Sequence, residues 1–438
     1  MKYFGLLVMC MVLTVTSYGQ SLDQEKLNNY FDALVNAEKM MGAVMMVQDG
    51  DILYQYAFGY ADMESEIKNV IDTEFRIGSI SKMFTAVLIL RAMENGLLDL
   101  DATIDAYFPE VENAAQISIR HLLQHRSGIR SFTEGGQYLT WYTTPKTRSE
   151  LYDILVNQGS EFTPNARANY SNSNYVLLTW LLEDIYGKDY SELLQEQITG
   201  PLGLKSTRIG GKIDSSAKQA KSYVMHVDWT LSEETDMSVP LGAGAIISNM
   251  KDLTIFIHAL FDGQLIQSSS LENMMTTQDN FGLGMLRIPF QEYVSYGHTG
   301  GIDGFRSVLS YFPEEKLAVA FASNGADYDT NLAPVAMLSA YFGQDFSIPE
   351  FNQENLPESE LERLLGDYAS EIFPLEISLC LEGGKLIGRA TGQPSFPLTY
   401  EGDYLFSFSP ASLTLQFSPD SDTMILKQGG MTFEFNKK

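Results

Sequence analysis

The chain has 438 residues, of which 45% are hydrophobic and 12% aromatic, so it has enough apolar surface to form a folded core and is not intrinsically disordered. Its formal net charge of -27 excludes nucleic acid as a partner, because a polyanion would be repelled and no cluster of Lys and Arg offsets the charge. Beyond the N-terminal segment, no run of about 18 apolar residues predicts a membrane span, so we expect no stable membrane insertion of the mature protein.

The first residues have the pattern of an export signal. Lys2 precedes an apolar run over 4–13, and small residues around Gly19 mark a cleavage site. We therefore expect residues 1–19 to be removed as a signal peptide and the mature protein to be periplasmic or secreted. Cys380 would then be the single cysteine of the mature chain, which could form no internal disulfide.

Residues 20–345 carry the pattern of one large α+β domain. Apolar residues at helical spacing predict a first helix over 21–40. Two apolar runs follow, at 42–48 and 52–60, and the turn signal Asp49-Gly50 between them predicts a β-hairpin.

The rest of this domain is predicted to be helical in its middle and β at its end. One helix is expected over 79–94 and another from near Tyr175, and a second hairpin is expected from strands at 305–312 and 317–323. Because strands at both ends enclose a helical middle, we expect one antiparallel sheet, assembled from both ends of the domain and covered by helices.

The C-terminal part differs from the first domain in its composition and in its pattern of apolar residues. Residues 346–360 are polar and punctuated by proline, which predicts a linker. Over 361–438, short runs of alternating apolar residues are separated by turns, a pattern typical of a small antiparallel β-barrel-like domain: Leu375, Ile377, Leu379 and Leu381, then Leu413, Leu415 and Phe417, then Phe433 and Phe435.

Ser79 and Lys82 stand three residues apart at the start of the helix predicted over 79–94. This spacing places a hydroxyl and an amine on one helical face, where the amine can activate the serine as a nucleophile. The spacing alone is weak evidence, because three other serines also precede a lysine by three residues: Ser65, Ser215 and Ser248. The helix N-terminus gathers unpaired backbone N–H groups, which favour an oxyanion at Ser79.

Two further motifs bear polar groups suited to the same chemistry. Tyr170-Ser171-Asn172 places a phenol and an amide before an apolar helix; a neighbouring ammonium can lower the pKa of such a tyrosine, and the amide can hold a lysine. In His298-Thr299-Gly300-Gly301, the glycine pair lets a substrate approach the strand closely, and a backbone N–H there can complete an oxyanion hole.

In this order, the three motifs resemble those of the serine β-lactamase and penicillin-recognising family, in its class C-like branch of β-lactamases, D-peptidases and esterases. The resemblance covers about 22–342 and extends to flanking segments at 122–128, 200–204, 242–244 and 281–284. It implies an antiparallel sheet flanked by helices beside a helical subdomain, with the active site between them and a small β-barrel appended.

The resemblance also implies a role for each motif residue. Ser79 would be the acylated nucleophile, Lys82 its proton acceptor, and Tyr170 the relay of the proton to the leaving group. The residues Asn172, His298, Thr299 and Gly300 would bind the substrate, and the backbone N–H groups of Ser79 and Gly301 would form the oxyanion hole. No metal or cofactor is implied.

His298 departs from the lysine common in penicillin-binding members, and it carries less positive charge near neutral pH. A weaker hold on a β-lactam carboxylate is expected, which favours an esterase, D-amino-acid peptidase or amidase over a dedicated β-lactamase. The expected partner is a small molecule or a peptide, cell-wall fragments included, while the oligomeric state is left open. Asn165, where the family often has glycine, is a second departure.

Three alternatives compete with this interpretation. His121 and His125 could share a helical face as metal ligands, but Leu122 stands where a zincin would have its glutamate. A serine hydrolase of the Gly-x-Ser-x-Gly type is excluded because the chain lacks that motif. A catalytically weak or inactive penicillin-binding-like protein, which binds peptide or cell-wall fragments, is the main rival to an enzyme.

Overall fold

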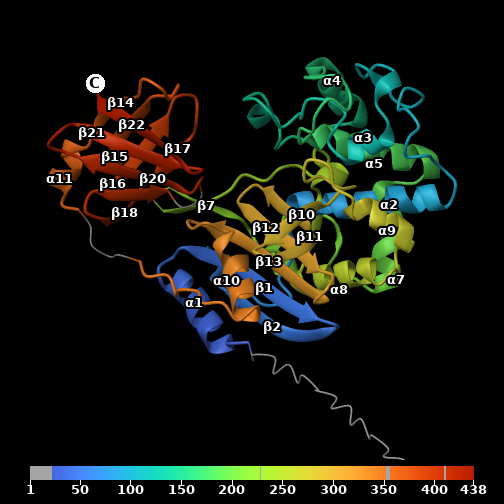
Figure 1. Cartoon of the computed structure of the whole chain (residues 1–438), viewed down its shortest axis with the longest axis horizontal. Coiled ribbons are helices and arrows are strands. Elements are labelled where there is room, and N and C mark those ends of the chain that lie inside the picture. Colours follow the sequence, from blue (N-terminus) through green and yellow to red (C-terminus); the bar gives the residue numbers. More distant parts are fainter. Residues whose placement is uncertain (1–21, 227, 352–355, 409–410) are drawn as a thin grey trace, which may run out of the picture.

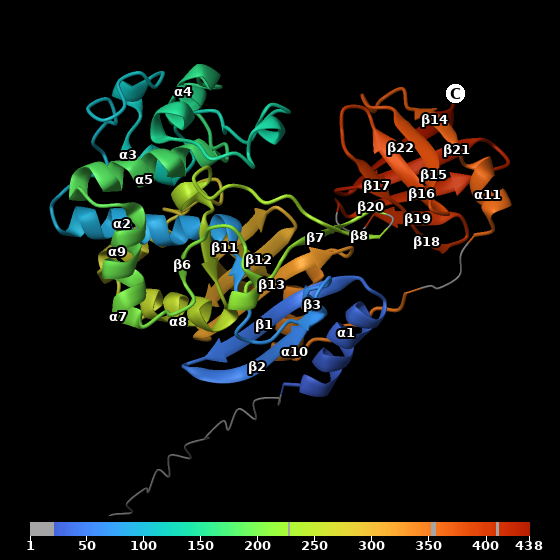
Figure 2. The same ribbon diagram turned by 180° about the vertical axis from the view of Figure 1, so that it is seen from behind.

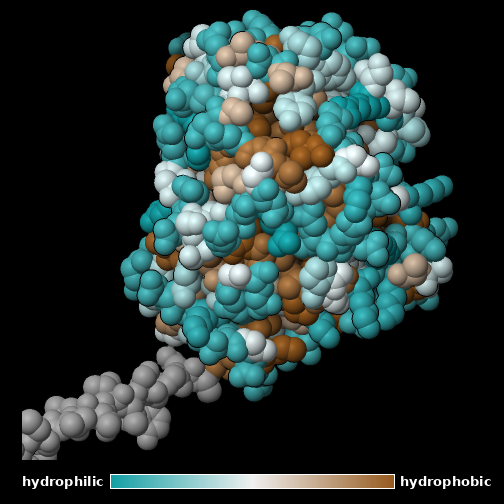
Figure 3. All heavy atoms as spheres, turned by 90° about the vertical axis from the view of Figure 1, so that its right-hand side faces the viewer, coloured by the Kyte–Doolittle hydropathy of each residue, from teal (hydrophilic) through white to brown (hydrophobic). Residues whose placement is uncertain are grey.

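The computed structural model describes residues 22–226, 228–351, 356–408 and 411–438 (Figure 1). The predicted signal peptide over 1–19 lies outside the described residues. Within the described ranges, no helix has both the length and the apolar character needed to cross a bilayer. The face shown in Figure 3 is mostly hydrophilic, with apolar residues gathered toward its upper part.

The main sheet is built from both ends of the N-terminal domain, as the sequence predicts. Its antiparallel strands follow the order β10-β11-β12-β13-β1-β2, and a small hairpin of β7 and β8 joins it beside β13. Both predicted hairpins are confirmed. The strands are β1 (Met40–Gln48), β2 (Asp51–Phe58), β7 (Tyr223–Met225), β8 (Trp229–Leu231), β10 (Leu286–Phe290), β11 (Tyr293–Ile302), β12 (Phe305–Phe312) and β13 (Leu317–Ala326).

Strand β1 shows why this sheet is covered on both faces. Successive side chains of a strand point to opposite faces, and here both sets are buried. Met45 packs in a core with α2, α5 and α8, whereas Val44 packs in a second core with α1 and α10. Full burial of each such side chain stabilises the fold by about 1.5–3 kcal/mol, so the two cores hold the sheet between two layers of helices.

The helices fall into three groups (Figures 1 and 2). Two cover the outer face of the sheet: α1 (Gln24–Asn36) and α10 (Leu332–Tyr341). Three pack in the larger core: α2 (Ser81–Glu94), α5 (Asn172–Tyr186) and α8 (Met250–Phe261). The remaining helices of this domain are α3 (Ile119–Leu123), α4 (Arg148–Gln158), α6 (Tyr190–Leu194), α7 (Gly200–Leu202) and α9 (Ser268–Met275).

Two small sheets complete the N-terminal domain. One pairs β3 (Tyr60–Asp62) with β4 (Ile67–Lys68). The other joins β5 (Phe75–Arg76), β9 (Ile246–Ser248) and β6 (Arg208–Ile209), and thereby ties the segment just before Ser79 to distant parts of the chain.

The C-terminal domain is a nine-stranded antiparallel sheet with its own apolar core. The order is β17-β16-β15-β14-β22-β21-β20-β19-β18, and the two end strands are separated in the chain only by Leu398, as in a barrel. Helix α11 (Glu358–Arg363) begins inside the segment predicted as a linker. The strands are β14 (Gly366–Ala369), β15 (Ile377–Glu382), β16 (Lys385–Ala390), β17 (Ser395–Pro397), β18 (Thr399–Gly402), β19 (Leu405–Phe408), β20 (Leu413–Ser418), β21 (Thr423–Gln428) and β22 (Met431–Lys437).

The two domains touch through polar contacts. The Lys39 amine donates a hydrogen bond to Thr399 Oγ1 over 3.2 Å, and the Ser412 hydroxyl donates one to Asp329 Oδ2 over 3.0 Å. The α+β fold class is confirmed, with an antiparallel sheet flanked by helices, a helical subdomain and a C-terminal β-barrel-like domain.

Candidate active site

Ser79 lies in a short 3-10 helix, Gly78–Ile80, that leads directly into α2. The α-helix expected from Ser79 therefore begins two residues later, at Ser81. Gly78 has a φ of 50°, and a Cβ there would lie 2.8 Å from the Gly301 nitrogen. Glycine is needed at this position because the turn carrying Ser79 lies directly against strand β11.

Lys82 is fully buried on the first turn of α2. Its amine lies 3.1 Å from Ser79 Oγ, 2.8 Å from Asn172 Oδ1 and 2.7 Å from the Ala243 carbonyl oxygen. Burial lowers the pKa of Lys82 well below its usual range. In the neutral amine, two N–H groups donate to Asn172 and Ala243, and the lone pair is left to accept the Ser79 proton.

Tyr170 donates a hydrogen bond to Ser79 Oγ over 2.7 Å. The expectation of a lowered pKa for Tyr170 was wrong: burial raises it, and this effect exceeds the lowering by the hydrogen bond with Ser79. Tyr170 is thus a protonated phenol at neutral pH. It is a proton donor aimed at the serine oxygen.

Asn172 begins α5 and links Lys82 to a polar loop. Its amide nitrogen donates to Thr133 Oγ1 over 3.0 Å, and its backbone nitrogen donates to Ser131 Oγ over 3.1 Å. The amide oxygen is therefore fixed toward Lys82. This fixed orientation explains how an asparagine holds the amine while its side chain also lines the pocket.

Strand β11 brings the third motif beside Ser79. His298 is 3% exposed, and its Nδ1 lies 2.5 Å from the Thr299 carbonyl oxygen. Burial lowers the pKa of His298 to about 3, so the ring is neutral at pH 7. The Thr299 side chain is exposed, and Thr299 is not among the residues that line the pocket at Ser79.

The glycine pair of β11 serves two purposes. A Cβ on Gly300 would lie 2.0 Å from the Ile77 carbonyl oxygen, so only glycine lets the strand pack against the segment before Ser79. The hairpin turn between Ile302 and Phe305 has two residues, which makes Gly301 and Arg306 the next pair, without ladder hydrogen bonds between them. The Gly301 N–H therefore points away from β12, toward the Ser79 turn.

Two contributors to this site are not evident from the motifs. Ala243 acts through its backbone carbonyl, which carries no signature of residue type, although its segment is among the flanks resembling the family. His125 accepts a hydrogen bond from the Ser171 backbone nitrogen over 3.1 Å, and its ring lies 4.4 Å from that of Tyr170. His121 instead accepts a hydrogen bond from the Ser118 backbone nitrogen, so the two histidines bind different backbone segments.

Local structure explains two further positions, Asn165 and Ser248. Asn165 has a φ of 67°, a conformation that asparagine tolerates better than most residues, which explains how it replaces the usual glycine. Ser248 is buried and bonded to Thr207, and Lys251 is exposed, so this copy of the Ser-x-x-Lys spacing forms no pair.

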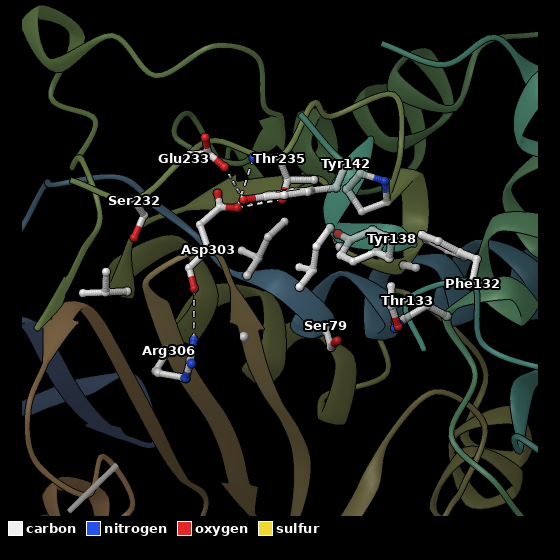
Figure 4. Close-up of a pocket in the computed structure, with 18 of the residues that line it drawn as sticks. Ser79, Phe132, Thr133, Tyr138, Tyr142, Ser232, Glu233, Thr235, Asp303 and Arg306 are labelled. Carbon is white, nitrogen blue, oxygen red and sulfur yellow. Dashed lines mark hydrogen bonds between the residues drawn. The ribbon is translucent and has the colours of Figure 1, made fainter. Parts of the chain in front are cut away.

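A cavity of about 660 Å³ opens over Ser79 (Figure 4). Figure 4 places Phe132, Thr133 and Tyr138 on one side of the serine and Arg306 on the other. Its lining includes Ser79, Phe132, Thr133, Tyr138, Leu139, Tyr142, Asn172, Val224, Leu231, Ser232, Glu233, Ala243, Gly244, Gly301, Ile302, Asp303 and Arg306. Ser79 and Gly301 line this pocket, and the Lys82 amine and the Tyr170 phenol both contact the Ser79 hydroxyl, a set of groups suited to acyl transfer.

Comparison with known proteins agrees with this geometry. The family model described as Beta-lactamase matches residues 27–341. Penicillin-binding protein 4* of Bacillus subtilis is 28% identical over 355 residues, which cover 75% of this chain and 78% of that protein.

Two solved structures are also similar. D-amino acid amidase from Ochrobactrum anthropi, complexed with D-phenylalanine, is 26% identical with a TM-score of 0.64, over 73% of this chain and 99% of that one. An octameric penicillin-binding protein homologue from Pyrococcus abyssi is 21% identical with a TM-score of 0.66, over 94% of this chain and 99% of that one, a likeness of fold alone. The chain belongs to the Beta-lactamase family and is a serine hydrolase of the β-lactamase-related type, acting on an amide or ester bond.

Proposed function

We propose that Ser79 forms an acyl-enzyme and that Lys82 accepts its proton. The observation that carries this proposal is the shared contact of one oxygen: Ser79 Oγ lies 3.1 Å from the Lys82 amine and 2.7 Å from the Tyr170 hydroxyl. As Oγ attacks the substrate carbonyl carbon, the Ser79 proton moves to the neutral amine and the carbonyl oxygen takes the negative charge.

The oxyanion is stabilised by the backbone N–H groups of Ser79 and Gly301. In related chemistry, loss of one such donor costs about 10² to 10³ in rate. When the tetrahedral intermediate collapses, the bond to the leaving amine or alcohol breaks, and Tyr170 gives that group a proton. Lys82 returns its proton to Tyr170. Water then attacks the carbonyl carbon of the Ser79 ester, with the proton transfers running in the opposite direction, and this step releases the acid and restores the Ser79 hydroxyl.

For the substrate, we propose an ester or amide with a D-configured acyl group. The neutral His298 leaves the third motif without a cation to hold a β-lactam carboxylate, which favours an esterase, D-amino-acid peptidase or amidase over a β-lactamase. The similarity to a D-amino acid amidase supports the same class. We further propose that the protein is exported and meets small peptides there, cell-wall fragments included; the N-terminal sequence pattern supports export.

A covalent label tests the nucleophile directly. Wild type is incubated with a fluorophosphonate and with a p-nitrophenyl ester, and the products are measured by intact mass and by absorbance. We expect one adduct per chain, located on Ser79 by peptide mapping, and none in Ser79→Ala.

Two further variants make the test specific. Lys82→Ala should reduce acylation by about 10² to 10⁴ while leaving the circular dichroism spectrum unchanged, since Lys82 acts as a proton acceptor. Ser65→Ala removes a serine with the same spacing to a lysine and should retain full labelling. An adduct that persists in Ser79→Ala, or equal rates in Lys82→Ala, would overturn the assignment.

A further inference from the structure

Arg306 places a guanidinium beside the proposed oxyanion hole. It lies on β12 directly opposite Gly301, and its Nη1 is 3.6 Å from the position a Gly301 Cβ would occupy. The side chain is exposed and lines the pocket that contains Ser79. Its hydrogen bonds go to two backbone carbonyl oxygens, of Asp303 and Phe305. Asp303 lies close enough to act on the guanidinium electrostatically, although Arg306 forms no ion pair within the described part of the chain.

The acidic side chains around Arg306 already have partners. Both carboxylate oxygens of Asp303 are used, one by Arg76 and the other by Thr235. Asp327, on the far side of Arg306, pairs with Lys39 at 2.6 Å. Arg306 is therefore a cation whose charge is available to a ligand in a protein that is otherwise strongly acidic.

The strand direction indicates which part of a substrate meets this cation. The leaving group must lie near Tyr170, its proposed proton donor, and Tyr170 packs near His298, with ring centroids 6.2 Å apart. The carbonyl oxygen lies between the N–H groups of Ser79 and Gly301. Arg306 faces Gly301, three residues beyond His298 along β11 and away from the leaving-group end. The acyl part of the substrate therefore extends toward Arg306.

The opposite end of the pocket is apolar and aromatic, with Phe132, Tyr138 and Leu139 in its wall. In Figure 4, Ser79 lies between these rings and Arg306. Glu233 also lines this pocket, where its carboxylate accepts a hydrogen bond from the Tyr142 hydroxyl at 2.9 Å. An acyl group with one apolar branch and one anionic branch would therefore match the aromatic end and the Arg306 end of the pocket.

We propose that Arg306 binds a carboxylate carried by the acyl part of the substrate, as in an N-acylated D-amino acid whose N-acyl chain ends in an acid. This inference rests on the proposed function, because the acyl side is defined by the attack of Ser79. Arg306 is a specificity-determining residue in this scheme and takes no part in proton transfer.

Three matched amides test the charge preference: D-phenylalanine p-nitroanilide and its N-acetyl and N-succinyl derivatives, which present an ammonium, a neutral amide and a carboxylate. We expect kcat/KM to be at least about tenfold higher for the N-succinyl than for the N-acetyl amide, as for a charge-assisted contact. Arg306→Ala should abolish this preference and leave hydrolysis of the N-acetyl amide nearly unchanged. Arg287→Ala, which removes an exposed arginine of strand β10 outside the pocket, should keep this preference.

Several outcomes would overturn the proposal. A preference that survives in Arg306→Ala, or equal rates for the N-acetyl and N-succinyl amides in wild type, would remove Arg306 from substrate binding. The N-acetyl-D-phenylalanine amide of 5-amino-2-nitrobenzoate carries its carboxylate on the leaving group. If Arg306→Ala lowers kcat/KM for this amide alone, the acyl side was wrongly assigned.

A binding measurement separates this inference from the proposed function. In Ser79→Ala, calorimetric titration with N-succinyl-D-phenylalanine and N-acetyl-D-phenylalanine should still show tighter binding of the succinyl compound. This difference should be lost or reversed in the double variant that also carries Arg306→Ala. If no amide is hydrolysed but this difference persists, the reaction assignment fails and the anion site stands. If hydrolysis occurs without any difference in binding, the anion site fails alone.

Discussion

Arg76 and Asp303 form an ion pair of 2.7 Å in which the side chains are only 2% and 1% exposed. Arg76 ends β5, three residues before Ser79, and Asp303 lies in the turn that follows Gly301. The second oxygen of Asp303 accepts hydrogen bonds from the Thr235 backbone and hydroxyl, over 3.0 and 2.6 Å. One buried pair thus fixes the nucleophile segment, the oxyanion strand and a loop of the pocket wall to each other.

Breaking this pair should destabilise the protein and reduce activity together. Asp303→Asn leaves the buried Arg76 guanidinium with a single acidic partner, the partly exposed Glu234, and should lower the free energy of unfolding by about 3 kcal/mol. Urea denaturation and kcat/KM measure the two effects. Asp49→Asn breaks an exposed pair with Lys316 and should change stability by less than about 0.5 kcal/mol. Equal stability of the two variants would contradict the prediction.

The neutral state of Lys82 predicts the acid limb of the pH profile. Only the neutral amine can accept the Ser79 proton, so kcat/KM should rise with pH through the Lys82 pKa, which burial places well below the usual range of lysine. Asn172→Asp sets a carboxylate beside the amine and favours its charged form, so the limb should move up by about 1 to 3 pH units. Asn29→Asp, on the exposed side of α1, should leave it in place.

His298 should contribute nothing to that limb. Its pKa of about 3 keeps the ring neutral from pH 5 to 9, so any titration of activity in this range belongs to another group. His298→Gln should therefore retain the position of the acid limb, whatever its effect on the maximal rate. If the acid limb vanishes or moves in this variant, the titration belongs to His298, and the assignment of Lys82 as the base fails.

Neighbouring glycines of β11 should differ sharply in their tolerance of alanine. A methyl group at 300 would overlap the Ile77 carbonyl oxygen, and overpacking of this kind typically costs about 1–3 kcal/mol. At 301, the nearest atom to a new Cβ is Arg306 Nη1 at 3.6 Å, an ordinary contact. Thermal unfolding should thus show a lower Tm for Gly300→Ala than for Gly301→Ala, and the opposite order would refute the close packing of β11 on the Ser79 turn.

The fold could be predicted where the sequence pattern is local. Strand β1 is a continuous apolar run that ends at a turn, and its hairpin follows from neighbouring residues alone. The start of α2 was misplaced by two residues, because the 3-10 helix at Gly78–Ile80 arises from the packing of β11 against it. Helix α11, by contrast, begins after a proline in a polar segment whose composition resembles a linker.

The candidate site was predictable in its residue types but not in its electrostatics. Spacing and order identified Ser79, Lys82 and Tyr170, since a reaction requires those groups. The lowered pKa of Lys82 depends on burial by segments distant in the chain, such as that of Ala243, whose carbonyl accepts a hydrogen bond from the amine across 161 positions. The pKa of Tyr170 was expected to be lowered by a neighbouring ammonium, whereas burial raises the pKa of Tyr170 and lowers that of Lys82. Such effects belong to the assembled core, which no local pattern describes.

Strand β1 pairs with β2, its neighbour in sequence, and also with β13, the last strand of the main sheet to be synthesised. A growing chain therefore presents the open edge of an apolar strand, Met40–Gln48, until nearly all of the N-terminal domain has been translated. Open apolar edges pair readily with other chains, and contacts distant in sequence form slowly. Newly made chains of this protein are thus most vulnerable to aggregation before β13 arrives, and the same step completes the sheet on which the reaction depends.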